Sequence, residues 1–220
     1  MGSAGLTDGI PMPTIEWNRM WRDNLQVYSQ DPADGHYGNQ WGDPDKVEIL
    51  SHVKDRFITP YVAKSKTALE IGSGGGRWTQ YMLGFDRVFC VDINREMFHY
   101  LLERFGGRPE LAFCETDGTT FPHIGRRSVD YVFSFGTFVH LDPPIIEGYL
   151  NNLRPLLTPG ATIVLQYADK EKEMAAQNEG FAMTTRAIMT DMVKTAGYVV
   201  VEEDNSSLPH SNVIRFQFLR

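Results

Sequence analysis

The chain has 220 residues, 42% of them hydrophobic, and its 28 acidic residues outnumber its 21 lysines and arginines. A chain of this length can bury one substantial core, which predicts a single domain with an N-terminal extension. The net charge of -7, without a dense basic cluster, argues against nucleic acid as a partner. Because no apolar run is long enough to span a bilayer, we expect a cytoplasmic protein without a membrane partner.

The N-terminal part of the chain predicts helices rather than strands. We expect a disordered lead at residues 1–12 and a helical cap over residues 13–62. Within this cap, apolar residues three and four positions apart predict an amphipathic helix at residues 14–28, with Trp17 and Trp21 on its apolar stripe. This stripe is explained equally well by packing and by contact with a substrate.

A turn-rich loop follows at residues 30–42, where several glycines alternate with polar residues. Asp43 and Pro44 then have the residue types of an N-cap and a first helical turn, so we expect the next helix to begin there. The loop also carries aromatic and imidazole rings that could stack against a ligand. These ring-bearing residues are His36, Tyr37 and Trp41.

From residue 63 onward, short apolar runs alternate with amphipathic ones. We expect strands at residues 67–71, 87–91, 111–115, 130–135, 161–166, 198–203 and 213–219. We expect helices at residues 77–83, 95–104, 143–157 and 185–195. This alternation predicts an α/β fold with a mostly parallel sheet covered on both faces. The last two strands have no helix between them, so we expect the final strand to be antiparallel.

The strongest local signal is the run EIGSGGGR at residues 70–77, where a strand enters a glycine-rich turn. Glycines allow a tight turn and close approach of a ligand, and a following helix would offer unpaired amide groups. A nucleotide-like ligand is therefore expected. The dinucleotide fingerprint requires a glycine where this chain has Arg77, which disfavours NAD or FAD.

Glu70, with glycines at positions 72, 74 and 76, resembles instead the first motif of class I S-adenosylmethionine-dependent methyltransferases. Motifs similar to that family's later ones follow in the same order, at the ends of the next three strands and at residues 156–160. The resemblance covers residues 63–220 and implies a Rossmann-like methyltransferase domain that binds S-adenosylmethionine. The cofactor site that it implies consists of Glu70, Gly72, Ser73, Gly74, Asp92, Ile93, Asp117, Gly118, Ser134 and Phe135.

Two carboxylates in this set have separate interpretations. Asp92 ends the second strand, about twenty residues after the glycine turn, where a carboxylate can accept hydrogen bonds from ribose hydroxyls. Asp117 follows the third strand, where the resemblance implies an acidic side chain near the adenine amino group. An Asp-Gly pair at a strand end is also a common turn, which is the alternative for Asp117.

Methyl transfer to a hydroxyl requires a base, and His140 is the expected catalytic residue because it follows the fourth strand. The alternative is a histidine that only holds a neighbouring loop. Asp142 and two prolines then resemble the motif of amino-group methyltransferases, but they come too late after the strand and Ile145 replaces the aromatic residue. Asp142 fits better as a helix N-cap, so oxygen is the favoured acceptor atom.

Asp142 and Asp169 could also reach one hard cation such as Mg²⁺, as in some sugar O-methyltransferases. Helix capping by Asp142 and a solvated Asp169 are the alternatives. For the acceptor, Tyr37 and Trp41 are the expected contacts. The loop at residues 35–44 is similar to bacterial methyltransferases that tailor glycans or natural products, including those that methylate mannosides in mycobacterial polysaccharide synthesis.

We therefore expect an S-adenosylmethionine-dependent O-methyltransferase acting on a hydroxyl of a sugar or a similar polyhydroxylated small molecule. The expected partners are a small-molecule or oligosaccharide acceptor and a second copy of the chain in a homodimer. Two alternatives remain open: a small-molecule N-methyltransferase, and a non-catalytic adenosyl-binding partner protein.

Overall fold

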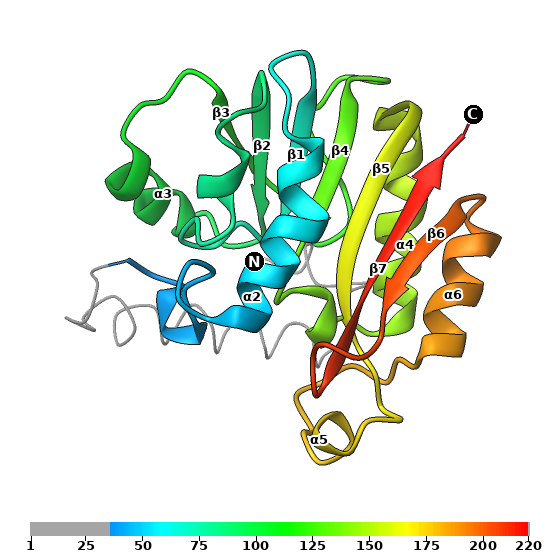
Figure 1. The fold of residues 1–220 in the computed structure, drawn as a ribbon. Helices are drawn as coiled ribbons and strands as arrows, with labels where there is room; N and C mark the ends of the chain where they lie inside the picture. Colours follow the sequence, from blue (N-terminus) through cyan, green and yellow to red (C-terminus); the bar gives the residue numbers. More distant parts are fainter. Residues whose placement is uncertain (1–35, 220) are drawn as a thin grey trace, which may run out of the picture.

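A single seven-stranded sheet organises the computed structural model, which describes residues 36–219 (Figure 1). The strand order is β3-β2-β1-β4-β5-β7-β6. The strands are β1 (Thr67–Ile71), β2 (Arg87–Asp92), β3 (Leu111–Glu115), β4 (Val129–Ser134), β5 (Leu157–Ala168), β6 (Val199–Asp204) and β7 (Ser211–Phe218). The expected lead and the helix at residues 14–28, with Trp17 and Trp21, lie outside the described residues.

The sheet confirms the predicted fold class. Strands β1 to β5 pair in parallel, whereas β7 runs antiparallel to both β5 and β6. The direction changes because β6 and β7 are joined by a short loop without a crossover helix. The class I methyltransferase arrangement that the sequence implied, a Rossmann-like mostly parallel sheet with an antiparallel last strand, is therefore the observed one.

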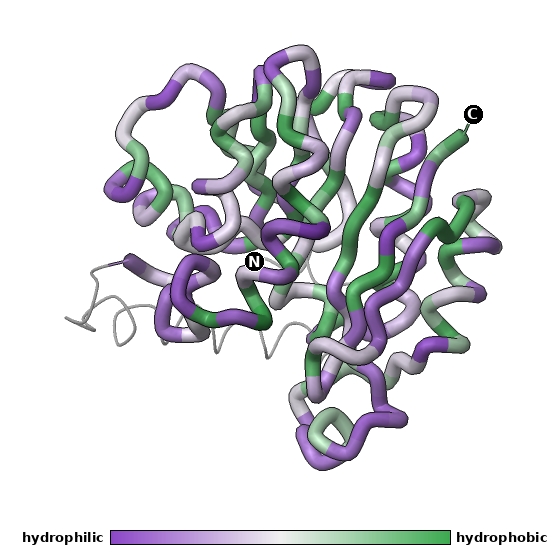
Figure 2. Tube along the Cα trace, viewed as in Figure 1, coloured by the Kyte–Doolittle hydropathy of each residue, from purple (hydrophilic) through white to green (hydrophobic). Residues whose placement is uncertain are grey.

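Helices pack on both faces of this sheet and create two cores. On one face, α4 (Pro143–Leu153) and α6 (Arg186–Thr195) bury Leu150 and Val193 against β4, β5 and β7. On the other face, α2 (Glu48–Val53) and α3 (Met97–Phe105) bury Leu50 and Leu101. A further α-helix, α5 (Glu173–Ala176), is a single turn after β5. Figure 2 shows the hydrophobic residues concentrated along the central strands, as burial of both faces requires.

Two predicted helix starts are wrong. Residues 77–83 form only a short 3-10 turn, Thr79–Met82, because the connection from the glycine turn must reach β2 within a few residues while burying Met82 and Phe85. The helix expected to begin at Asp43 begins instead at Glu48. The Asp43 carboxylate accepts a hydrogen bond from the Asp45 amide (2.9 Å), and this local turn competes with a helix start.

The helix predicted at residues 143–157 is shorter than expected. It begins at Pro143 with Asp142 at the N-cap position, as predicted, but ends at Leu153. Pro155 follows in a 3-10 turn, and proline lacks the amide hydrogen that an α-helix needs. Within residues 36–219, no helix has the length and apolar character needed to cross a membrane.

Candidate functional site

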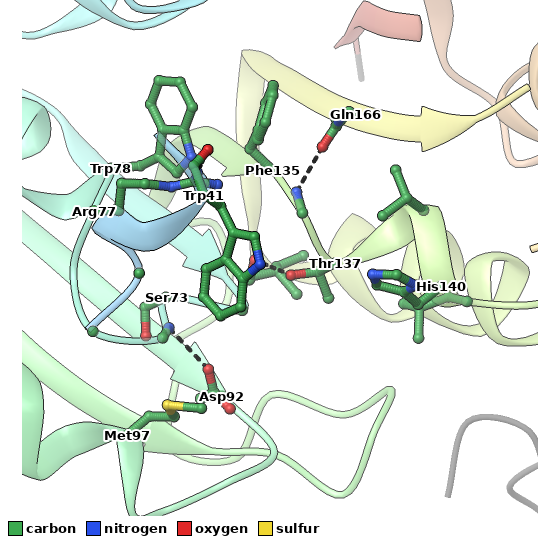
Figure 3. Close-up of a pocket in the computed structure, with 18 of the residues that line it drawn as sticks. Trp41, Ser73, Arg77, Trp78, Asp92, Met97, Phe135, Thr137, His140 and Gln166 are labelled. Carbon is green, nitrogen blue, oxygen red and sulfur yellow. Dashed lines mark hydrogen bonds between the residues drawn. The ribbon is translucent and has the colours of Figure 1, made fainter. Parts of the chain in front are cut away.

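A cavity of about 700 Å³ lies at the carboxyl ends of the parallel strands, within the volume range of small-molecule sites (Figure 3). Its walls include Ile71 at the end of β1, Asp92 at the end of β2 and Phe135 after β4. In the sheet order, β1 and β4 are neighbours although the chain leaves them toward opposite edges. Such a switch point is where open α/β sheets bind their ligands.

The glycine turn forms one wall of the cavity. Gly72, Gly74 and Gly76 all have positive φ angles (71°, 51° and 87°), a conformation that favours glycine. A Cβ atom on Gly72 would lie 1.9 Å from the Thr137 Oγ1 atom, so this glycine allows β1 and the loop after β4 to meet. A Cβ atom on Gly74 would have no atom of residues 36–219 within 4 Å. Gly72 is therefore required by packing within the protein, whereas Gly74 leaves space in the cavity wall.

Ser73 and Asp92 provide polar groups beside this turn. The Ser73 hydroxyl is buried without a hydrogen-bond partner among the described residues. The Asp92 carboxylate accepts hydrogen bonds from the backbone amides of Gly74 (3.0 Å) and Asn94 (2.9 Å). Burial raises the pKa of Asp92 to about 6, and these amide hydrogen bonds oppose the shift. A ligand with hydroxyl donors fits this carboxylate, since each oxygen can accept a further hydrogen bond.

Three expected cofactor residues do not line the cavity. The Glu70 carboxyl is buried and accepts a hydrogen bond from the Thr79 hydroxyl (2.5 Å), and burial raises its pKa to about 8. The Ser134 hydroxyl donates to the Ile71 carbonyl (2.8 Å) behind the strand ends. Asp117 closes its own turn by accepting hydrogen bonds from the amide and hydroxyl of Thr120. Its neighbours Thr116 and Gly118 line the cavity instead.

The other expected cofactor residues do line the cavity, and they come from the ends of the four strands β1 to β4. They are Gly72, Ser73, Gly74, Asp92, Ile93, Gly118 and Phe135. The cavity also includes the side chain of Met97, which begins α3. This set supplies amide groups, a carboxylate and apolar walls to one ligand.

His140 lies across the cavity from Ser73 and Asp92 (Figure 3). Its Nδ1 atom is 2.8 Å from the Gly180 carbonyl oxygen. Since a carbonyl only accepts hydrogen bonds, Nδ1 carries the proton and the lone pair of the neutral ring is on Nε2. Burial lowers the pKa of His140, which keeps the ring neutral at physiological pH. The ring therefore has the protonation state of a general base.

Aromatic rings extend the wall beyond His140. The Phe181 ring lies between two imidazoles, with its centroid 5.5 Å from that of His140 and 5.1 Å from that of His210. Both Phe181 and His210 line the cavity. They come from the loops that follow β5 and β6, which contain no recognisable motif, so sequence reasoning missed them.

The expected acceptor contacts, Tyr37 and Trp41, both line the cavity, whereas His36 is exposed outside it. Tyr37 is buried and stacks on Tyr100, with ring centroids 5.1 Å apart. Trp41 is 41% exposed, and Figure 3 shows its indole directed into the cavity toward Thr137. The Trp41 indole thus lies in the wall of the cavity, while Tyr37 packs against Tyr100 of α3.

The two proposed metal ligands lie apart from the cavity lining. The Asp169 carboxylate accepts hydrogen bonds from the Asn212 amide group (2.8 Å) and from the backbone amide of Glu171 (3.2 Å). Asp142 is at the N-cap position of α4. Among residues 36–219, no group of three or more His, Cys, Asp or Glu side chains is arranged to hold a metal ion. The expected Mg²⁺ site thus gains no support from these aspartates.

Comparison with protein families gives one match. Residues 68–160 match the family model described as a methyltransferase domain. This segment runs from β1 through the glycine turn, Asp92 and His140 to the start of β5. The match therefore contains the strand ends that form most of the cavity. Among curated proteins, none matches the chain.

Solved structures share the fold at low sequence identity. A SAM-dependent methyltransferase from Aquifex aeolicus has a TM-score of 0.63 and 17% identity, covering 89% of this chain and 97% of its own. An S-adenosylmethionine-dependent methyltransferase from Mesorhizobium loti has a TM-score of 0.67 and 12% identity, covering 80% and 100%. The 1,6-didemethyltoxoflavin-N1-methyltransferase of Burkholderia thailandensis, with S-adenosylhomocysteine bound, has a TM-score of 0.62 and 17% identity, covering 96% and 92%.

Proposed function

We propose that this protein, an S-adenosylmethionine-dependent methyltransferase by its matched domain and its fold, methylates a hydroxyl group of a neutral small molecule. The observation that carries the proposal is the His140 ring in the cavity wall, with its Nδ1 proton directed to Gly180. A hydroxyl is a poor nucleophile until it loses its proton, and a neutral imidazole can accept that proton.

The residues at the glycine turn suit the proposed cofactor. Asp92 would accept hydrogen bonds from the ribose hydroxyls. The Ser73 hydroxyl, which has no hydrogen-bond partner among residues 36–219, lies one residue before Gly74 and could contact the same ligand. Ile93 and Met97 supply apolar contact for the adenine ring. When bound, S-adenosylmethionine supplies an electrophilic methyl group on a positively charged sulfur.

The chain's own contribution to the reaction is orientation and proton transfer. His140 would accept at Nε2 the proton that the acceptor hydroxyl loses when it is methylated. The Gly180 carbonyl fixes the ring by its hydrogen bond to Nδ1 and stabilises the resulting imidazolium. Trp41, partly exposed over the cavity, would exclude water from the acceptor.

For the acceptor itself, we favour a sugar or a similar polyhydroxylated molecule. The rings of Trp41 and Phe181 offer flat apolar surfaces against which the face of a sugar can pack. The sequence of the loop that contains Trp41 also resembles that of glycan-tailoring methyltransferases. The most specific of these resemblances is to the mycobacterial mannoside O-methyltransferase. An oligosaccharide acceptor would extend from this end of the cavity.

A nitrogen acceptor is the second candidate, because two structural neighbours are N-methyltransferases. One is the 1,6-didemethyltoxoflavin-N1-methyltransferase described above. The other is the glycopeptide N-methyltransferase MtfA, with a TM-score of 0.57, 16% identity and coverage of 77% of this chain and 85% of its own. Their acceptors differ chemically, so they favour a nitrogen acceptor without specifying one.

Methyl transfer to a panel of matched acceptors tests the proposal. With a methyl glycoside as the acceptor, we expect S-adenosylhomocysteine and methylated product to form in equal amounts. With an amino sugar whose hydroxyls are all blocked, we expect neither product to form. Turnover confined to amines would favour the N-methyltransferase. Cofactor binding without turnover on any acceptor would favour a non-catalytic adenosyl-binding protein.

Replacing Asp92 with alanine is expected to weaken S-adenosylmethionine binding by about 1.5 to 3 kcal/mol, because hydrogen bonds to a charged acceptor are lost. Isothermal titration calorimetry measures this change. Asp117→Ala is the matched control, since Asp117 also follows a strand end but directs its carboxylate into its own turn. An equal loss of cofactor affinity in both variants would mean that Asp117 also contacts the cofactor. Unchanged cofactor affinity in Asp92→Ala would mean that Asp92 does not contact it.

A further inference from the structure

The loop between β6 and β7 places a second imidazole, that of His210, in the cavity wall. The His210 ring is half-buried and stacks on Phe181, with an interplanar angle of 19° and ring centroids 5.1 Å apart. Within residues 36–219, neither ring nitrogen of His210 makes a hydrogen bond. The proposed proton transfer does not use this ring.

Hydrogen bonds hold the backbone on both sides of His210. The Lys172 ammonium donates to the carbonyls of Leu208 and Ser211, at 2.8 Å each. The Asp169 amide donates to the His210 carbonyl (3.2 Å). Both donors belong to the segment after β5 that leads to α5, which lies beside this loop (Figure 1). The imidazole is therefore positioned before a ligand arrives, as a binding group must be to act selectively.

Phe181 connects His210 to the proposed base. The amide of the next residue, Ala182, donates to the Val139 carbonyl (2.8 Å), which joins the Phe181 segment to the turn that carries His140. The Phe181 ring in turn contacts both imidazoles. Two imidazoles that contact one ring are close enough for one small acceptor to reach both.

The protonation state of His210 suits a hydroxyl partner. Burial lowers the pKa of His210 below its ordinary value of 6.5, and the positive charge of Lys172 and the nearby His140 lower it further, so the ring is neutral at pH 7. A neutral imidazole has one N–H donor and one acceptor nitrogen. A hydroxyl both donates and accepts, so it can pair with this ring in either tautomer. The charge of Lys172 disfavours an ammonium group at the same place.

We infer that His210 is a specificity-determining residue that binds a second hydroxyl of the acceptor while His140 accepts the proton of the first. The inference rests on the proposed function, because it names what else the acceptor must carry. An acceptor with one hydroxyl would displace water from His210 without replacing its hydrogen bond, which costs free energy. Sites built to pair with a hydroxyl reject analogues that lack it.

A set of simple ring alcohols tests this inference, because its members differ from cyclohexanol only by a second hydroxyl. The set is cyclohexanol and the 1,2-, 1,3- and 1,4-cyclohexanediols. In wild-type protein we expect kcat/KM for at least one diol to exceed that for cyclohexanol at least about tenfold. In His210→Phe, which keeps a ring against Phe181, this ratio should fall to about twofold or less, the ratio that two equivalent hydroxyls give statistically. His210→Gln, whose amide can donate and accept, should recover part of the preference.

His99→Phe is the matched control, since His99 is exposed on α3 and pairs with Glu103, and it should keep the wild-type ratio. The affinity for S-adenosylhomocysteine, measured by calorimetry, shows whether each variant is folded. An unchanged ratio in His210→Phe, or a wild-type ratio of about two for every diol, would overturn the inference. Equal losses of kcat/KM for diol and cyclohexanol would also overturn it, since His210 would then only support the cavity wall.

Nuclear magnetic resonance separates this inference from the proposed function. With S-adenosylhomocysteine bound, we expect at least one diol to shift the ring nitrogen signals of His210, which are identified by their absence in His210→Phe. Cyclohexanol at the same concentration should leave these signals unchanged. The shift without methyl transfer to any hydroxyl would mean that the proposed function fails while His210 still binds hydroxyls. Methyl transfer to diols without the shift would overturn the role of His210 alone.

Discussion

The substitution Gly74→Val is expected to abolish cofactor binding while the domain stays folded. Gly74 lies in the cavity wall, and within the described part of the chain no atom lies within 4 Å of a Cβ added there. A branched side chain would occupy the space where the backbone and the ligand meet. We expect no measurable binding of S-adenosylhomocysteine by calorimetry, which for a micromolar ligand means a loss of about 100-fold or more.

Backbone strain must be separated from this steric effect. Gly74 has a φ of 51°, so valine there costs on the order of 1 to 3 kcal/mol of folding free energy. Gly106→Val is the matched control, because Gly106 has a φ of 67° and no atom within 4 Å of an added Cβ, but follows α3 away from the cavity lining. Both variants should unfold at similar denaturant concentrations. Normal binding to Gly74→Val would mean that the turn has only a structural role.

Alanine at position 140 is expected to lower turnover by roughly 100-fold or more while cofactor affinity hardly changes. General-base catalysis contributes about 10² to 10⁴ in rate, and His140 is the residue proposed to accept the proton. The measurement is kcat at saturating cofactor and acceptor. His99→Ala is the control, since His99 is an exposed histidine paired with Glu103 on α3. Turnover near the wild-type value in His140→Ala would leave catalysis to positioning alone.

The pH dependence of kcat gives a second measure of the same residue. Burial lowers the pKa of His140 below the ordinary value of 6.5, so the neutral base persists at and somewhat below that pH. Turnover should fall as pH drops through this lowered pKa, because a protonated ring cannot accept a proton. Saturating cofactor is essential, since the pKa of Asp92 is about 6 and its titration would weaken cofactor binding in the same range.

Much of the fold could be predicted because its signals are local. The runs at residues 67–71 and 111–115 are apolar and bounded by polar residues, and both became strands with those bounds. The helix predicted at residues 77–83 is only a short 3-10 turn, because the connection must reach β2 within a few residues. The local sequence pattern does not contain this distance. Likewise, the start at Asp43 failed because its side chain stabilises a turn.

The site residues that could be predicted from the sequence are those at or shortly after the ends of predicted strands. Asp92 ends β2, His140 lies in the loop after β4, and both line the cavity. Glu70 lies one residue before the end of β1 and is buried in the core instead. A shift of one residue along a strand end therefore decides whether a side chain faces the cavity or the core. Gln166 was missed although it lies within its predicted strand, because its contact is a hydrogen bond that its side chain accepts from the Gly136 amide (2.7 Å), a residue 30 positions earlier in the chain.

The position of β7 in the sheet has a consequence for how the chain folds. Among the described strands, β6 pairs only with β7, and β7 completes the pairing of β5 through contacts between segments far apart in sequence. Pairing over such separations is slow, because loop closure precedes the gain in contacts. A nascent chain that has not yet released residues 211–218 from the ribosome would expose the apolar edge of β5. Early chaperone contact would protect this edge from aggregation until β7 arrives.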